Sequence, residues 1–77
     1  MKEIKVLGTG CANCRNTVAL IERVASEHAL AINLQKIEDL PEIMSYGLLS
    51  MPGVMVDGKV VHAGGVPSRE KVESWLT

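Results

Sequence analysis

The stretch SMPGVMVDGKVVHAGG, residues 50–65, contains one of the strongest structural signals of the sequence. Within it, Asp57-Gly58 stands between two apolar runs, Gly53–Val56 and Lys59–Ala63. An Asp-Gly pair between such runs is a strong signal for a β-hairpin with a two-residue turn. Gly64-Gly65 ends the second arm, because consecutive glycines break a strand. The stretch therefore predicts two antiparallel strands with a proline just ahead of the first.

Short helices are predicted on both sides of this hairpin. Before it, Asp39 can cap a helix that has Pro41 in its first turn and runs to about residue 45 or 46. Gly47 follows and is well placed to end that helix. After the hairpin, Ser68 can cap a closing helix. The apolar stripe of that closing helix is Val72, Trp75 and Leu76.

The N-terminal half reads as strand, helix and strand. Lys2–Leu7 is a strand, and the spacing of apolar residues becomes helical from Cys11 to about residue 27 or 28. Ala29–Ile37 is a second strand, apolar enough to be central in the sheet. A crossover of this length makes a right-handed parallel unit. The order β-α-β-α-β-β-α predicts an α/β fold, one four-stranded mixed sheet flanked by helices, in a single domain over residues 1–77.

The composition narrows the choice of partners. Hydrophobic residues make up 47% of the 77 residues and charged residues 22%, which is typical of a globular domain. The net charge is −1, with lysines and arginines scattered singly, so nucleic acid and anionic membranes are not expected partners. No apolar run reaches the roughly 20 residues that span a bilayer. The expected location is the cytoplasm.

Both cysteines of the chain, Cys11 and Cys14, lie in GTGCANC at the predicted start of the first helix. In a reducing compartment such a pair is not expected to be a structural staple. A helix N-terminus favours the thiolate, and Arg15 adds a positive charge in the same turn. Cys11 would then attack a substrate disulfide, and Cys14, nearer the core, would resolve the mixed disulfide. With Arg15, Asn13 between the cysteines is a candidate for tuning their pKa.

Two thiolates can instead hold a soft metal ion, Cu(I) or Zn(II). GTGCANC resembles the Gly-Met-x-Cys-x-x-Cys loop of heavy-metal-associated domains, although Thr9 stands where that motif has methionine. A closed zinc site would need two more ligands, and only His28 and His62 are available. His28 is expected at the far end of the first helix. The cysteine loop alone leaves the choice between redox chemistry and metal binding open.

The second half of the chain resembles a different family. SMPGVMVDGKVVHAGG and the preceding EDLPEIMSYGLL are similar to the segment of thioredoxins and glutaredoxins that leads through a short helix to a proline, a hairpin and Gly-Gly. With the CxxC helix and the closing helix, the resemblance covers almost the whole chain. It is strongest to the small thioredoxin/glutaredoxin-like proteins of archaea and bacteria, which carry a Cys-x-x-Cys site.

This resemblance implies a thioredoxin-like fold and a thiol–disulfide oxidoreductase that needs no cofactor. It implies that Pro52 follows a cis peptide bond and faces the cysteines. It also implies that Met51, Pro52 and Gly53, with Gly64-Gly65, form the substrate-binding side. The expected partners are a disulfide-containing protein and a reductant, either a thioredoxin reductase-like protein or a low-molecular-weight thiol. A soft-metal module remains the alternative.

The chain also departs from the family pattern. Gly10 stands where thioredoxins usually have tryptophan, and Ala12-Asn13 replaces Gly-Pro between the cysteines. Val66-Pro67 replaces the acidic or hydroxyl residues with which glutaredoxins help to bind glutathione. The use of glutathione therefore stays open.

Overall fold

A computed structural model describes residues 2–48 and 50–77. The chain forms four strands and three helices in the predicted order. Their bounds are β1 (Lys2–Leu7), α1 (Ala12–Glu27), β2 (Ile32–Ile37), α2 (Leu40–Ser45), β3 (Gly53–Val56), β4 (Lys59–Ala63) and α3 (Arg69–Leu76).

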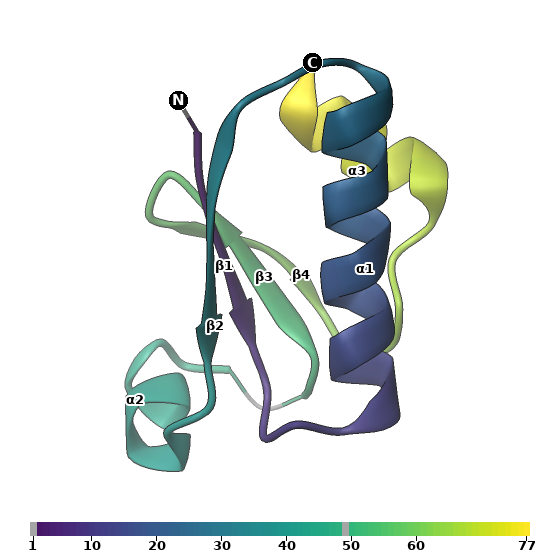
Figure 1. The fold of residues 1–77 in the computed structure, drawn as a ribbon. Helices are drawn as coiled ribbons and strands as arrows, with labels where there is room; N and C mark the ends of the chain where they lie inside the picture. The colour runs from purple at the N-terminus through teal and green to yellow at the C-terminus, as the bar shows by residue number, and fades with distance from the viewer. Residues whose placement is uncertain (1, 49) are drawn as a thin grey trace.

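The strands form one mixed sheet in the order β2-β1-β3-β4. β1 pairs parallel with β2, while β3 is antiparallel to both β1 and β4. α1 and α3 lie together on one side of the sheet, and α2 lies at its lower end in Figure 1. The predicted four-stranded α/β architecture is confirmed.

The predicted turns and caps are present. Asp57 and Gly58 have φ values of 50° and 87°, as the two central residues of a primed hairpin turn require. The Asp39 carboxylate accepts a hydrogen bond from the N–H of Glu42 at 3.3 Å. The Ser68 hydroxyl does the same for the N–H of Lys71 at 3.1 Å. These side chains satisfy backbone donors that a helix leaves unpaired at its start.

The prediction for the second strand was wrong in two respects. β2 begins at Ile32 rather than Ala29, because Ala29 and Leu30 close the C-terminus of α1. β2 also lies at the edge of the sheet rather than in its centre. Its side chains alternate between half-buried and exposed over most of its length, since only the face toward α1 is covered.

Alternating residues of the central strands give the sheet an apolar layer on each face. The larger layer joins β1 and β3 to α1 and α3, and its buried residues are Ile4, Val6, Val18, Ile21, Val24, Ala25, Val54, Val72 and Leu76. The smaller layer joins the opposite face to α2, and its buried residues are Leu7, Ile43, Leu48 and Met55. We call these the major and minor cores.

Four ends of elements meet at the lower end of the molecule in Figure 1. They are the ends of β1 and β4 and the starts of α1 and β3. This arrangement brings two distant parts of the sequence together. The cysteine loop after β1 lies at the same end as the proline segment before β3.

Candidate active site

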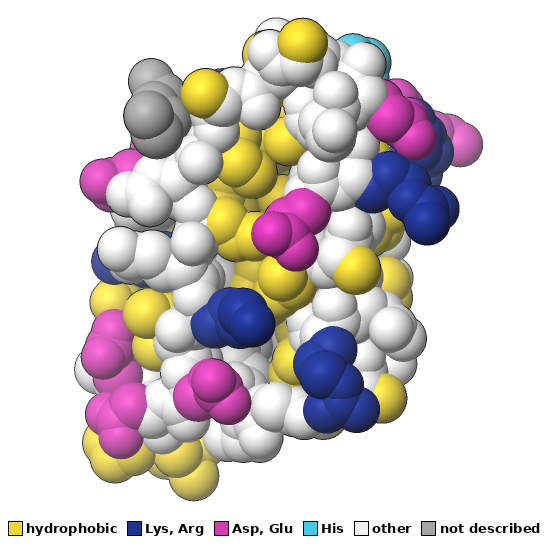
Figure 2. All heavy atoms as spheres, viewed as in Figure 1, with side chains coloured by type: hydrophobic (Ala, Val, Ile, Leu, Met, Phe, Trp, Pro, Cys, Tyr) yellow, Lys and Arg dark blue, Asp and Glu magenta, His cyan; other side chains and the backbone are white. Residues whose placement is uncertain are grey.

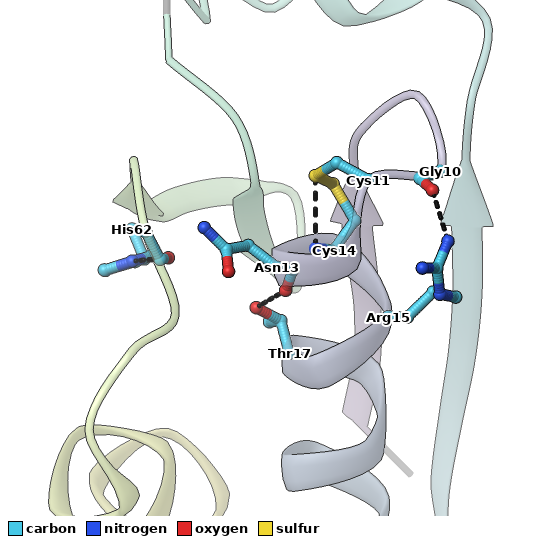
Figure 3. Close-up of a disulfide and its surroundings, with 8 residues drawn as sticks. Gly10, Cys11, Asn13, Cys14, Arg15, Thr17 and His62 are labelled. Atoms are coloured by element: carbon cyan, nitrogen blue, oxygen red, sulfur yellow. Dashed lines mark hydrogen bonds between the residues drawn. A yellow bond between two sulfur atoms is a disulfide. The ribbon is translucent and has the colours of Figure 1, made fainter.

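Cys11 and Cys14 form a disulfide, with their Cα atoms 5.1 Å apart (Figure 3). The two residues differ sharply in exposure. Cys11 lies at the surface, whereas Cys14 is 5% exposed and belongs to the first turn of α1. A partner molecule therefore has direct access only to Cys11.

Cys11 is also the N-cap residue of α1. Its backbone is extended, and its sulfur accepts a hydrogen bond from the N–H of Cys14 at 3.2 Å. The first turn of this helix contains no acidic residue that would repel a negative charge. A sulfur at this position meets an unpaired backbone donor and the positive end of the helix dipole, and both favour the thiolate after reduction.

Gly8 packs directly beneath the disulfide. A methyl group on its Cα would overlap Cys14 Sγ and would lie 3.9 Å from the Cα of Pro52. The inner sulfur and the start of the proline segment therefore both lie close to Gly8, on the side where a side chain would stand. The sequence alone does not identify Gly8 as a site residue, because no neighbouring residue indicates that the sulfur of Cys14 packs on it.

The predicted substrate-binding residues lie beside this point. Met51 precedes a cis peptide bond to Pro52 and is 40% exposed, whereas Pro52 and Gly53 are buried. The N–H of Gly64 donates to the carbonyl of Pro52 at 2.9 Å, and Gly65 continues the same turn. We call Met51–Gly53 together with Gly64-Gly65 the proline wall.

The two residues predicted to tune the cysteines are both exposed on α1. Arg15 donates from Nη1 to the carbonyl of Gly10 at 2.6 Å, so its guanidinium is directed at the loop backbone rather than at the sulfurs (Figure 3). The carbonyl of Asn13 accepts a hydrogen bond from the buried Thr17 hydroxyl at 2.8 Å. Arg15 and Thr17 therefore stabilise the loop and the first turn that carry the cysteines.

A groove beside Cys14 was not predicted. It has a volume of about 480 Å³ and runs between α1 and the strands β1 and β2. Figure 2 shows its apolar floor with charged side chains at its rim. The charged residues that line it are Arg15, Glu22, Lys36 and Glu38. Cys14 lines this groove and Cys11 does not, so the groove lies on the side of the inner cysteine.

The side chains of both histidines make their polar contacts with residues other than the cysteines. His28, at the end of α1, lies 3.2 Å from a carboxylate oxygen of Glu73. His62 contacts the carbonyl of Gly65 and the amine of Lys71. Over residues 2–48 and 50–77, no three His, Cys, Asp or Glu side chains cluster as a metal site would require. In the same part of the chain, no helix is long and apolar enough to cross a membrane.

These features define a class of protein. An exposed cysteine caps the first helix of an α/β domain and is disulfide-bonded to a buried one, beside a proline that leads into a strand. This is the arrangement of dithiol–disulfide exchange proteins, in which one sulfur attacks and the other resolves.

Comparison with known proteins places the chain within that class. A family model described as a thioredoxin domain matches residues 2–77. A thioredoxin of Methanothermobacter thermautotrophicus is 32% identical over 77 residues, which is the full length of both chains. A thioredoxin of Methanocaldococcus jannaschii is 30% identical over 76 residues, covering 99% of this chain and 87% of the other. The chain belongs to the thioredoxin domain family.

The chain is accordingly a thiol–disulfide oxidoreductase. The expectation from the Cys-x-x-Cys motif and the proline hairpin is confirmed. Neither the family match nor the named relatives support the soft-metal alternative.

Proposed function

We propose that Cys11 is the nucleophile and Cys14 the resolving thiol in the reduction of disulfides in protein partners. The observation that carries this assignment is the unequal exposure of the two residues, with Cys11 at the surface and Cys14 at 5%. The N–H of Cys14, 3.2 Å from Cys11 Sγ, supports it because this donor stabilises a thiolate at the outer position.

In the first step the Cys11 thiolate attacks one sulfur of the substrate disulfide. A mixed disulfide forms, and the other substrate sulfur leaves as a thiolate that takes a proton from water. In the second step Cys14 gives its proton to water and its thiolate attacks Cys11 Sγ. The Cys11–Cys14 disulfide forms and the second substrate thiolate leaves, so two electrons have passed to the substrate.

The proline wall is proposed to bind the substrate chain next to the cysteines. Met51 supports this because it is a large apolar side chain left 40% exposed in a small domain. Gly64 and Gly65 have φ values of 84° and 72°, so this part of the wall is a turn without side chains. An extended segment of a partner protein can therefore approach the backbone of Gly64 and Gly65 without meeting a side chain.

A reductant must return the oxidised pair to the dithiol. We propose a thioredoxin reductase-like protein or a low-molecular-weight thiol, and a cytoplasmic location. A dithiol that donates electrons is useful only where the surroundings keep it reduced, which is the condition of the cytoplasm.

Trapping of the mixed disulfide tests the assignment of roles. Reduced Cys14→Ser should form a stable adduct with insulin, a protein disulfide, and the adduct should be visible by mass spectrometry without reductant. Reduced Cys11→Ser should form none, because the remaining sulfur is buried. An adduct at Cys14 in the Cys11→Ser variant, formed as fast as the adduct at Cys11 in Cys14→Ser, would contradict the assignment of roles.

A further inference from the structure

His62 lies next to the proline wall but does not belong to it. It is the second-last residue of β4 and pairs across the sheet with Val54, two residues beyond Pro52. Its side chain is half-buried, and its ring centroid lies 6.0 Å from that of Trp75 on α3. Figure 3 draws it among the surroundings of the disulfide.

Each ring nitrogen of His62 has a hydrogen-bond partner. Nε2 lies 2.9 Å from the carbonyl oxygen of Gly65, which can only accept, so Nε2 carries a proton. Nδ1 lies 3.0 Å from Nζ of Lys71, and an ammonium can only donate, so Nδ1 accepts. Both ring nitrogens therefore have a hydrogen-bond partner, one in the turn after β4 and one on α3.

The His62 ring contacts the Gly64-Gly65 turn of the proline wall. Gly64 and Gly65 both have positive φ. Glycine adopts positive and negative φ about equally readily, so this turn needs further contacts to hold one conformation. His62 binds this turn through the Gly65 carbonyl, and Gly64 donates from the same turn to the Pro52 carbonyl at 2.9 Å. Lys71 of α3 holds the ring from its other side. A chain of contacts thus runs from α3 through His62 to the substrate side of the active site.

We propose that His62 is a positioning residue for substrate binding, which holds the Gly64-Gly65 turn against Pro52. This inference rests on the proposed role of the proline wall. Within residues 2–48 and 50–77, the hydrogen bonds of the His62 ring go to Gly65 and Lys71 and none goes to a sulfur. His62 therefore acts on the affinity for a partner protein and not on the attack by Cys11.

Two substitutions separate this role from a general structural one. In His62→Asn the amide is too short to reach Gly65, whereas in His62→Gln its Nε2 falls close to the position of the imidazole Nε2. We expect His62→Asn to raise KM for insulin reduction about five-fold, the effect of losing one hydrogen bond, with kcat unchanged. His62→Gln should restore most of the affinity. His28→Asn, at the far end of α1, is the matched control and should leave KM unchanged.

Two further readouts distinguish the possible failures. The rate at which Cys11 is alkylated by iodoacetamide, and the reduction of the small disulfide 5,5′-dithiobis(2-nitrobenzoate), should be the same in wild type and His62→Asn. An unchanged KM for insulin in His62→Asn, or an equal rise in His62→Asn and His62→Gln, would overturn the inference about His62. A wild-type protein that fails to reduce insulin at all would instead contradict the proposed function.

Discussion

At the scale of single residues, the site depends on one position where the chain has no side chain. The inner sulfur of Cys14 and the Cα of Pro52 both lie where a side chain of Gly8 would stand. The sequence places this glycine in a turn but does not show which side chain lies on it, because that contact joins β1 to α1 and β3 through the fold. The proposed role of His62 could not be predicted for the same reason. Its hydrogen-bond partners, Gly65 and Lys71, are three and nine residues further along the chain, and Lys71 belongs to another element.

Gly8→Ala should therefore disturb the redox site itself. The added methyl group would overlap Cys14 Sγ, and forcing an extra methyl into a packed site costs about 1–3 kcal/mol of unfolding free energy. We also expect insulin reduction to fall about ten-fold or more, because Cys14 must move from the position in which it meets Cys11. Urea unfolding and an insulin assay measure the two effects.

The control for Gly8→Ala is the same change in a Cys14→Ala background. Removal of the sulfur makes room for the methyl group, so the cost in stability should become much smaller in the double variant. Equal costs in both backgrounds would show that the methyl group meets something other than the sulfur.

At the scale of elements, local turn chemistry was predictable and the place of a strand in the sheet was not. The Asp39 and Ser68 caps and the Asp57-Gly58 turn each depend on a few neighbouring residues. The local sequence is therefore sufficient to predict them. The apolar run after α1 misled the prediction, because its first residues close the helix rather than begin β2. The edge position of β2 follows from which strands pair with β1, and no local pattern encodes that choice.

The C-terminus of α1 offers a direct test of this account. Ala29 has φ of 52°, and the N–H groups of Ala29 and Leu30 return to the carbonyls of Ser26 and Ala25 at 3.1 and 2.8 Å. This is a Schellman cap, whose left-handed residue is ordinarily glycine. Ala29→Gly should therefore raise the unfolding free energy by about 1 kcal/mol in urea. The matched control is Ala31→Gly, where φ is not positive, and it should leave stability unchanged or lower it.

The packing of α1 against α3 gives a prediction for pH. The hydrogen bond from Arg69 lowers the pKa of the Glu27 carboxyl from its ordinary value. A carboxyl whose pKa is lowered by folding adds stability above its unfolded pKa, near 4.5, and this stability is lost as the pH falls through the lower folded value. We expect the difference in stability between wild type and Glu27→Gln, measured by urea unfolding, to shrink between pH 7 and pH 3. Glu22→Gln on the same helix should show a smaller change, and an equal change would contradict the assignment to the Arg69 pair.

At the scale of the whole molecule, the two faces of the sheet are covered unequally. The major core joins β1 and β3 to two helices, α1 and α3. Among residues 2–48 and 50–77, the minor core is covered by α2, the shortest of the three helices, with Tyr46 and Leu48. α2 has six residues, too few to be stable as a helix without tertiary contacts. We infer that α2 and the minor core open more readily than the rest of the domain.

Hydrogen exchange should therefore divide the molecule in two. Amides of β1 and α1 should exchange only through global unfolding, whereas those of α2 should exchange through a local opening of lower free energy. Ile21→Ala in the major core should speed exchange everywhere, by a loss of about 2–5 kcal/mol. Ile43→Ala in the minor core should speed exchange in α2 while leaving β1 and α1 much closer to wild type. These isoleucines are 0% and 1% exposed, so the two variants remove equally buried groups and differ in which core they weaken. If α2 exchanged at the same free energy as β1 in the wild type, both cores would unfold as one unit, and a partner protein at the proline wall would meet a surface as rigid as the central sheet.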